Sequence, residues 1–65
     1  MDKDRLRREM EKAGLTQAEL ARQLRVSQPT VFAWLNGSQP RADLYERLLI
    51  VLPDLSARLE KTGVA

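Results

Sequence analysis

The sequence contains neither cysteine nor histidine. Their absence excludes disulfides and the usual zinc-finger ligands, and it removes the two commonest residue types for a catalytic nucleophile and base. The sequence also shows no glycine-rich phosphate loop and no paired-carboxylate motif. We therefore expect a protein that is not an enzyme and that uses no metal or cofactor.

Long apolar runs are missing as well. No stretch reaches the roughly 20 apolar residues of a membrane-spanning helix, and the N-terminal segment MDKDRLRREM has no apolar stretch typical of a signal sequence. We expect a cytoplasmic protein. At 65 residues the chain is expected to form one small domain over residues 1–65, with residues 62–65 as a frayed tail. A domain of this size buries only about 60% of the surface of its unfolded chain, so its stability is marginal without a partner.

Residues 17–36, QAELARQLRVSQPTVFAWLN, have the pattern of two short helices joined by a tight turn. Thr16 and Glu19 have the spacing of a capping box that begins the first helix. The apolar residues Leu20, Ala21 and Leu24 then fall on one face, and the helix breaks at Arg25-Val26.

Ser27 is a second N-cap candidate, Pro29 lies in the first turn of the second helix, and Gly37 ends that helix as a left-handed cap. Val31, Trp34 and Leu35 have the spacing of an inward face. The opposite face carries Gln28, Pro29, Phe32, Ala33 and Asn36. Because this face has few long or charged side chains, it suits close approach to base edges and thymine methyls. The pattern predicts a helix-turn-helix that reads DNA in the major groove.

The charge distribution is consistent with this interpretation. Residues 1–41 carry the net positive charge, whereas residues 42–65 are slightly negative. No carboxylate occurs from Leu20 to Ala42, a segment that contains Arg22, Arg25 and Arg41, so phosphates would meet no repulsion there. On the expected first helix, Arg5, Arg8 and Lys12 recur at i, i+3 and i+7. These three either approach the DNA backbone or form a solvated helix face.

The rest of the chain also indicates helices. A first helix is expected from Asp4 to Ala13, with Leu6, Met10 and Ala13 facing the core and Gly14 ending it. A later helix is expected from about Arg41 to Leu52, and a fifth from Asp54 to about Lys61. The expected fold is therefore all-α, a compact bundle of about five short helices.

The run from Leu48 to Leu52 is apolar on all sides, more than one buried stripe needs. We expect Ile50, Leu55 and Leu59 to contribute to a homodimer, because two-fold dimers read palindromic DNA with recognition helices about 34 Å apart. The alternative is that these side chains close the core of the monomer.

The segments L-T-Q-A-E-L-A, V-S-Q-P-T-V-F-A-W-L and N-G resemble the phage repressor and Cro type of helix-turn-helix regulators, which are XRE-like and have a lambda-repressor-like fold. The resemblance covers about residues 1–60 and is most specific from Leu15 to Gly37. It implies that Ala21 lets the two motif helices cross closely and that Gln28 reads an adenine. It also implies that Ser27, Pro29, Phe32 and Ala33 complete the reading surface. The implied phosphate contacts are Gln17, Arg25, Thr30, Asn36, Ser38 and Arg41.

Two residues depart from the family pattern. Arg25 stands in the turn where the family usually has glycine, and a left-handed backbone there costs about 1 kcal/mol for other residues. Pro29 replaces a polar base-reading side chain and can make only apolar contact.

The resemblance implies a sequence-specific regulator of transcription, a repressor or Cro-like protein of phage or bacterial type, which binds a palindromic operator as a homodimer and lies at the nucleoid when bound. The alternative function is a DNA-binding interaction module, such as an antitoxin-like partner that holds another protein through its C-terminal helices. The two functions can coexist.

Overall fold

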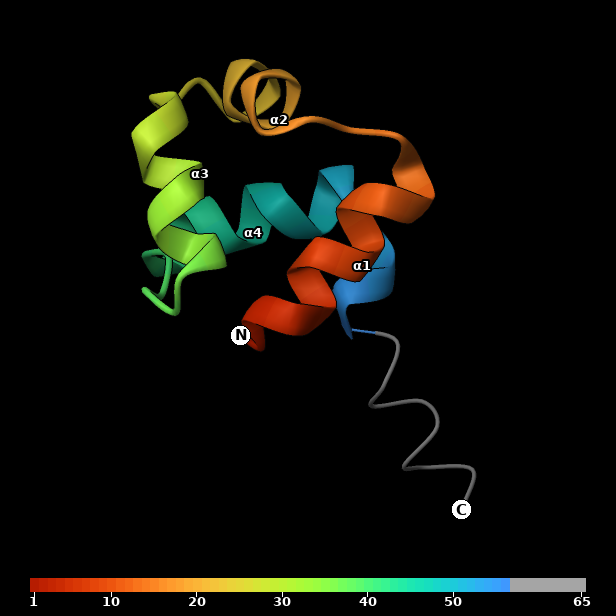
Figure 1. The fold of residues 1–65 in the computed structure, drawn as a ribbon. Helices are drawn as coiled ribbons and strands as arrows, with labels where there is room; N and C mark the ends of the chain where they lie inside the picture. The colour runs from red at the N-terminus through yellow and green to blue at the C-terminus, as the bar shows by residue number, and fades with distance from the viewer. Residues whose placement is uncertain (57–65) are drawn as a thin grey trace.

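The computed structural model describes residues 1–56. These residues form α1 (Lys3–Ala13), α2 (Gln17–Leu24), α3 (Gln28–Leu35), α4 (Ala42–Val51) and the 3-10 helix η1 (Pro53–Ser56) (Figure 1). The all-α prediction is confirmed, and residues 1–56 contain four α-helices and one 3-10 helix. A short 3-10 helix begins at Pro53 where the fifth helix was expected, and the rest of the Asp54–Lys61 prediction lies outside the described residues.

Three of the helices end in the same way. A residue just beyond the helix takes a left-handed backbone. Gly14 (φ 71°) and Arg25 (φ 59°) directly follow α1 and α2, and Gly37 (φ 109°) comes two residues after the last residue of α3. In each case the next amide bonds the carbonyl five residues back, as in the bond of 3.0 Å from Val26 N to Ala21 O. This is the Schellman pattern, which satisfies carbonyls that the helix leaves unpaired. The prediction that Arg25 occupies a glycine-like conformation is therefore confirmed.

The core lies where the four helices meet. Its buried side chains come from every helix and are Leu6, Met10, Leu20, Ala21, Leu24, Val31, Trp34, Leu35, Leu48, Leu52 and Leu55. The expectation that Ala13 faces this core is wrong, because Ala13 is exposed and Leu15, beyond the turn at Gly14, packs against the core instead. Trp34 is only 3% exposed, as its expected place on the inward face predicts.

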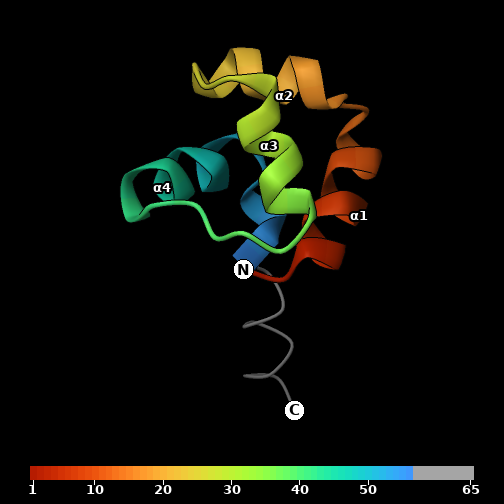
Figure 2. The same cartoon turned by 60° about the vertical axis from the view of Figure 1, so that its left-hand side comes forward.

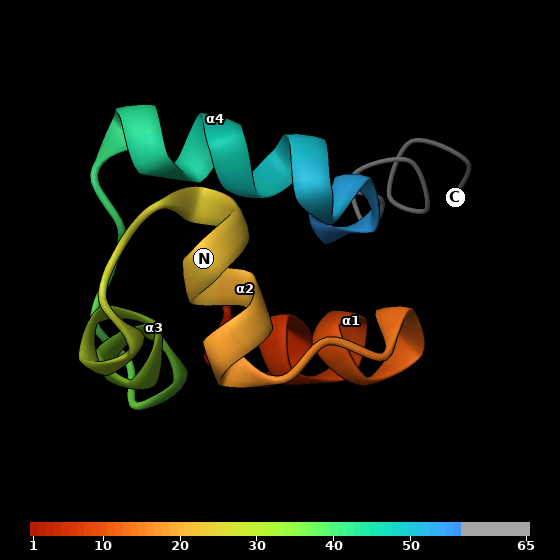
Figure 3. The same ribbon diagram turned by 90° about the horizontal axis from the view of Figure 1, so that it is seen from above.

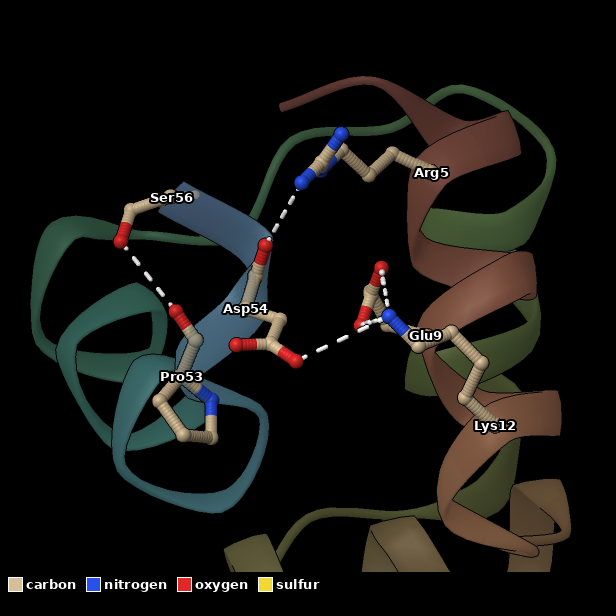
Figure 4. A network of polar contacts seen from close by, with 6 residues as sticks. All are labelled: Arg5, Glu9, Lys12, Pro53, Asp54 and Ser56. Atoms are coloured by element: carbon tan, nitrogen blue, oxygen red, sulfur yellow. Dashed lines mark hydrogen bonds and ion pairs between the residues drawn. The ribbon is translucent and has the colours of Figure 1, made fainter. Parts of the chain in front are cut away.

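A network of polar contacts holds η1 against α1 (Figure 4). Arg5 donates a hydrogen bond of 2.8 Å to the carbonyl oxygen of Asp54. The Lys12 ammonium lies 3.3 Å from the Glu9 carboxylate and 3.7 Å from that of Asp54. Arg5 and Lys12 therefore help to hold η1 against α1. The sequence analysis expected these side chains either at the DNA backbone or on a solvated helix face, and neither expectation included this role.

The arrangement leaves one side of α3 open. α3 packs against α2 and α1. In the view from above, α1 and α4 lie on opposite sides of α2, and α3 closes one end (Figure 3). No other element of residues 1–56 covers the outer side of α3 in any view (Figures 1 to 3). Within the same residues, every helix is too short or too polar to span a bilayer.

The loop between α3 and α4 is held at the start of the chain. Gln39 in this loop donates from Nε2 to the carbonyl oxygen of Met1 over 2.9 Å. Figure 2 shows the N-terminus beside this loop. The contact fixes the segment that connects the outer face of α3 to Arg41.

Candidate nucleic-acid interface

The start of α3 differs from the expected capping pattern. Ser27 is the N-cap residue, but its side chain makes no cap hydrogen bond to a backbone amide. Its hydroxyl instead shares a hydrogen bond of 2.8 Å with the hydroxyl of Thr30. Pro29 occupies the second helical position and has no N–H, so one of the two amides that an N-cap side chain ordinarily binds is missing. Ser27 is therefore the N-cap residue, as expected, but without a side-chain cap bond, and the two hydroxyls lie together at the start of α3.

The two faces of α3 separate as the sequence predicts. Val31, Trp34 and Leu35 are buried. Gln28, Pro29, Phe32 and Asn36 are exposed, and Ala33 is half-buried. The Thr16–Glu19 capping box of α2 is present as expected, and Gln17, the first residue of α2, lies beside this outer face of α3.

An open hollow lies between the two helices of the motif. Gln17 at the start of α2 and Gln28, Pro29 and Phe32 on α3 line it. Its lining is mostly apolar, with the amides of the two glutamines as the polar groups. The sequence assigned Gln17 to phosphate and the other three residues to bases, and the structure brings all four to one place. Sequence reasoning did not predict the hollow, because it depends on how α2 crosses α3.

Asn36 follows the last residue of α3 and bonds back to the helix. Its Nδ2 donates to the carbonyl oxygen of Phe32 over 2.8 Å. This bond orients the side-chain amide next to the outer face while leaving its oxygen available. Asn36 is thus held in one orientation before any ligand binds.

Three candidates for phosphate contact lie at the two ends of α3. Arg25 occupies the turn before α3, whereas Ser38 and Arg41 belong to the connection after it. Arg41 pairs with Asp43 over 3.3 Å, and both side chains are largely exposed. Exposed pairs of this kind contribute between zero and about 1 kcal/mol, so opening this one to bind another anion costs little.

Two arginines that the sequence analysis did not single out hold the ends of the motif helices. Arg7 donates to the carbonyl oxygen of Leu35, the last residue of α3, over 3.4 Å. Arg47 donates to that of Leu24, the last residue of α2, over 3.3 Å. A cation at a helix C-terminus both bonds an unpaired carbonyl and offsets the helix dipole. These arginines therefore support the position of α3 relative to α1 and of α2 relative to α4.

The residues expected at a dimer interface differ in their exposure. Ile50 on α4 is 80% exposed, whereas Leu55 is 4% exposed and belongs to the core. The expectation for Leu55 is wrong because η1 turns this side chain inward, so closing the core of the monomer is its role. Leu59 lies outside the described residues.

Comparison with known proteins gives one family. A family model described as helix-turn-helix matches residues 6–58, which include both helices of the motif. No curated protein and no solved structure matches the chain.

Proposed function

Because the chain belongs to the helix-turn-helix family of the phage repressor and Cro type, whose members are DNA-binding transcription regulators, we propose that it is a repressor that binds a palindromic operator as a homodimer. The outer face of α3 carries this proposal. It is uncovered within the described residues, it bears no charge, and it lies opposite a face that is fully committed to the core.

Base reading is assigned to this face. Gln28 pairs with an adenine through a bidentate amide contact, and Ser27, Pro29, Phe32 and Ala33 complete the reading surface. The exposure of Gln28, Pro29 and Phe32 supports this assignment. Ser27 and Thr30, whose hydroxyls pair, meet the duplex where α3 begins.

Phosphate binding is assigned to residues around the reading face. They are Gln17, Arg25, Thr30, Asn36, Ser38 and Arg41. The absence of carboxylates from Leu20 to Ala42 supports this assignment, because the segment around α3 then attracts the duplex without repulsion. The oriented amide of Asn36 and the weakly held Arg41 are ready to bind.

Dimerisation is assigned to the surface around Ile50. This side chain is 80% exposed on α4, which lies away from the outer face of α3. A second copy that covers it would remove apolar surface from water and hold two recognition helices about one helical turn of DNA apart.

The proposal is tested by selecting binding sites from a random duplex library with the full chain, at two salt concentrations. Enrichment of a palindrome with half-sites one turn apart is the expected result. Salt-sensitive retention without any enriched sequence would overturn the proposal, because phosphate contacts alone give such binding.

The exposed Ile50 also fits the second function, an antitoxin-like module that holds another protein. Single substitutions separate the two functions. Gln28→Ala impairs operator binding but leaves a protein contact at Ile50 intact, whereas Ile50→Ala does the reverse if another protein covers that surface. The second function is rejected if Ile50→Ala changes only self-association.

A further inference from the structure

The hollow formed by Gln17, Gln28, Pro29 and Phe32 places apolar surface in the middle of the reading face. Phe32 is 56% exposed there, although removing an aromatic ring from water is energetically favourable. Phe32 follows Pro29 by three residues and Gln28 by four, so the three side chains lie on one face of α3. A ligand that fills the hollow must therefore contact apolar surface beside the amide of Gln28.

The chemistry of the hollow restricts what fills it. A polar base edge that entered the hollow would lose its hydrogen bonds to water. Pro29 has no N–H and Phe32 has no polar side-chain atom, so neither residue could replace those bonds. Among the base groups of the major groove, the C5-methyl of thymine is the apolar one. Gln17 and Gln28 supply amides beside the apolar lining, which suits a methyl group attached to a polar pyrimidine ring.

We propose that this hollow receives the C5-methyl group of a thymine that neighbours the adenine bound by Gln28. The inference rests on the proposed function and deepens it, because it turns Pro29 and Phe32 from passive parts of the surface into specificity-determining residues. Where the family pattern has a polar side chain that reads a base by hydrogen bonding, Pro29 then helps to recognise a methyl group instead.

The proposal has a chemical consequence beyond thymine. The hollow recognises a methyl group on C5 of a pyrimidine, and 5-methylcytosine carries the same group in the same place. Binding at this position therefore responds to cytosine methylation, with the methylated base bound more tightly than cytosine.

The test uses the full chain and the palindrome obtained by selection. Each thymine is replaced in turn, in both half-sites, by deoxyuridine, which differs only by the missing methyl group. Burial of one methyl corresponds to about a fourfold change in affinity. The replacement removes one methyl from each half-site and the two factors multiply, so we expect about a fifteenfold loss at one symmetric pair of positions. With Phe32→Ala this ratio should fall close to one, and Phe32→Leu, which keeps an apolar side chain, should retain part of it.

Glu46→Gln is the control, because Glu46 is exposed on α4 and belongs to none of the proposed reading, phosphate or dimer surfaces. With this variant the ratio of thymine to deoxyuridine should stay unchanged. At the sensitive position, the affinity ratio of 5-methylcytosine to cytosine should be about fifteenfold in the palindrome and near one with Phe32→Ala.

Each contrary outcome has a distinct meaning. If the operator is bound but no thymine is sensitive to loss of its methyl, or if Phe32→Ala keeps the full ratio, the methyl site is overturned while the proposed function stands. If the library gives no operator, the proposed function fails and the methyl site fails with it. Helical content and melting temperature of the Phe32 variants are measured alongside, to check that the fold is unchanged.

Discussion

At the scale of single residues, Gln28 and Arg41 are expected to contact different parts of the duplex. Gln28→Ala should cost about 1–3 kcal/mol and relax the preference at one base position, because a bidentate contact is lost. Arg41→Ala should weaken all sequences alike and lower the slope of log affinity against log salt by about one. Affinities for a set of single-base operator variants at several salt concentrations measure both effects. A change of base preference with Arg41→Ala alone would reverse the two assignments.

Glu19 gives the capping box of α2 a defined pH dependence. The backbone N–H of Thr16 donates to its carboxylate over 2.9 Å, and this bond, with that from the Thr16 side chain, lowers the pKa of Glu19 below its ordinary value of 4.5. A lowered pKa in the folded state means that the stabilisation is present above the unfolded value and is lost as the pH falls through the folded value. The effect should be small, because the carboxylate is in contact with water.

Melting curves between neutral pH and about pH 3 test this dependence. Glu19→Gln keeps an acceptor oxygen but removes the titrating group, so its melting temperature should fall less on acidification than that of the natural chain. Glu46→Gln, a change at an exposed position on α4, is the control. An equal fall for the natural chain and Glu19→Gln would contradict the role of this carboxylate.

At the scale of elements, Arg25 in the turn between α2 and α3 is expected to lower the stability of the fold and to strengthen DNA binding. Arg25 has φ 59°, a conformation that costs about 1–2 kcal/mol for a residue with a Cβ. Arg25→Gly removes this strain but makes the unfolded chain more flexible, so we expect a net gain of up to about 1 kcal/mol in the free energy of unfolding. The same variant should bind DNA more weakly, because a proposed phosphate contact is lost. Denaturant unfolding and operator affinity, measured on one preparation, check both directions, and unchanged affinity would remove Arg25 from the phosphate contacts.

The ends of the elements also show what sequence alone can predict. Thr16 and Glu19 act on neighbours within a few residues, and so do Gly14 and Gly37. Their spacing is therefore sufficient to predict where α2 begins and where α1 and α3 end. The N-cap position of Ser27 was also predicted, but its hydroxyl bonds the Thr30 hydroxyl instead of a backbone amide, which the spacing does not indicate.

Local spacing patterns do not predict contacts between distant parts of the chain. Arg7 and Arg47 bond carbonyls 28 and 23 residues away, and nothing in the sequence near either arginine indicates its partner. The candidate site divides along the same line. The exposed stripe of α3 follows from helical spacing, whereas the hollow with Gln17 requires knowledge of how α2 crosses α3.

At the scale of the whole molecule, association is expected to depend on Ile50. Because this side chain is 80% exposed, Ile50→Asp should change the free energy of unfolding of the monomer by no more than about 0.5 kcal/mol. It should nevertheless prevent dimer formation, since a buried carboxylate without a partner is strongly unfavourable. Equilibrium sedimentation of both proteins, free and on operator DNA, measures the effect. A natural chain that stays monomeric at high concentration and on DNA would contradict the homodimer.

The position of Trp34 gives the molecule an optical property. It is the sole tryptophan of the sequence, it is 3% exposed, and it lies on the same helix as the reading face. Its fluorescence therefore reports on the core alone, with short-wavelength emission while the helices are packed and a red shift when water reaches the indole. Unfolding can be followed without any label, and a ligand that disturbs α3 should change this emission even when the helical content does not change.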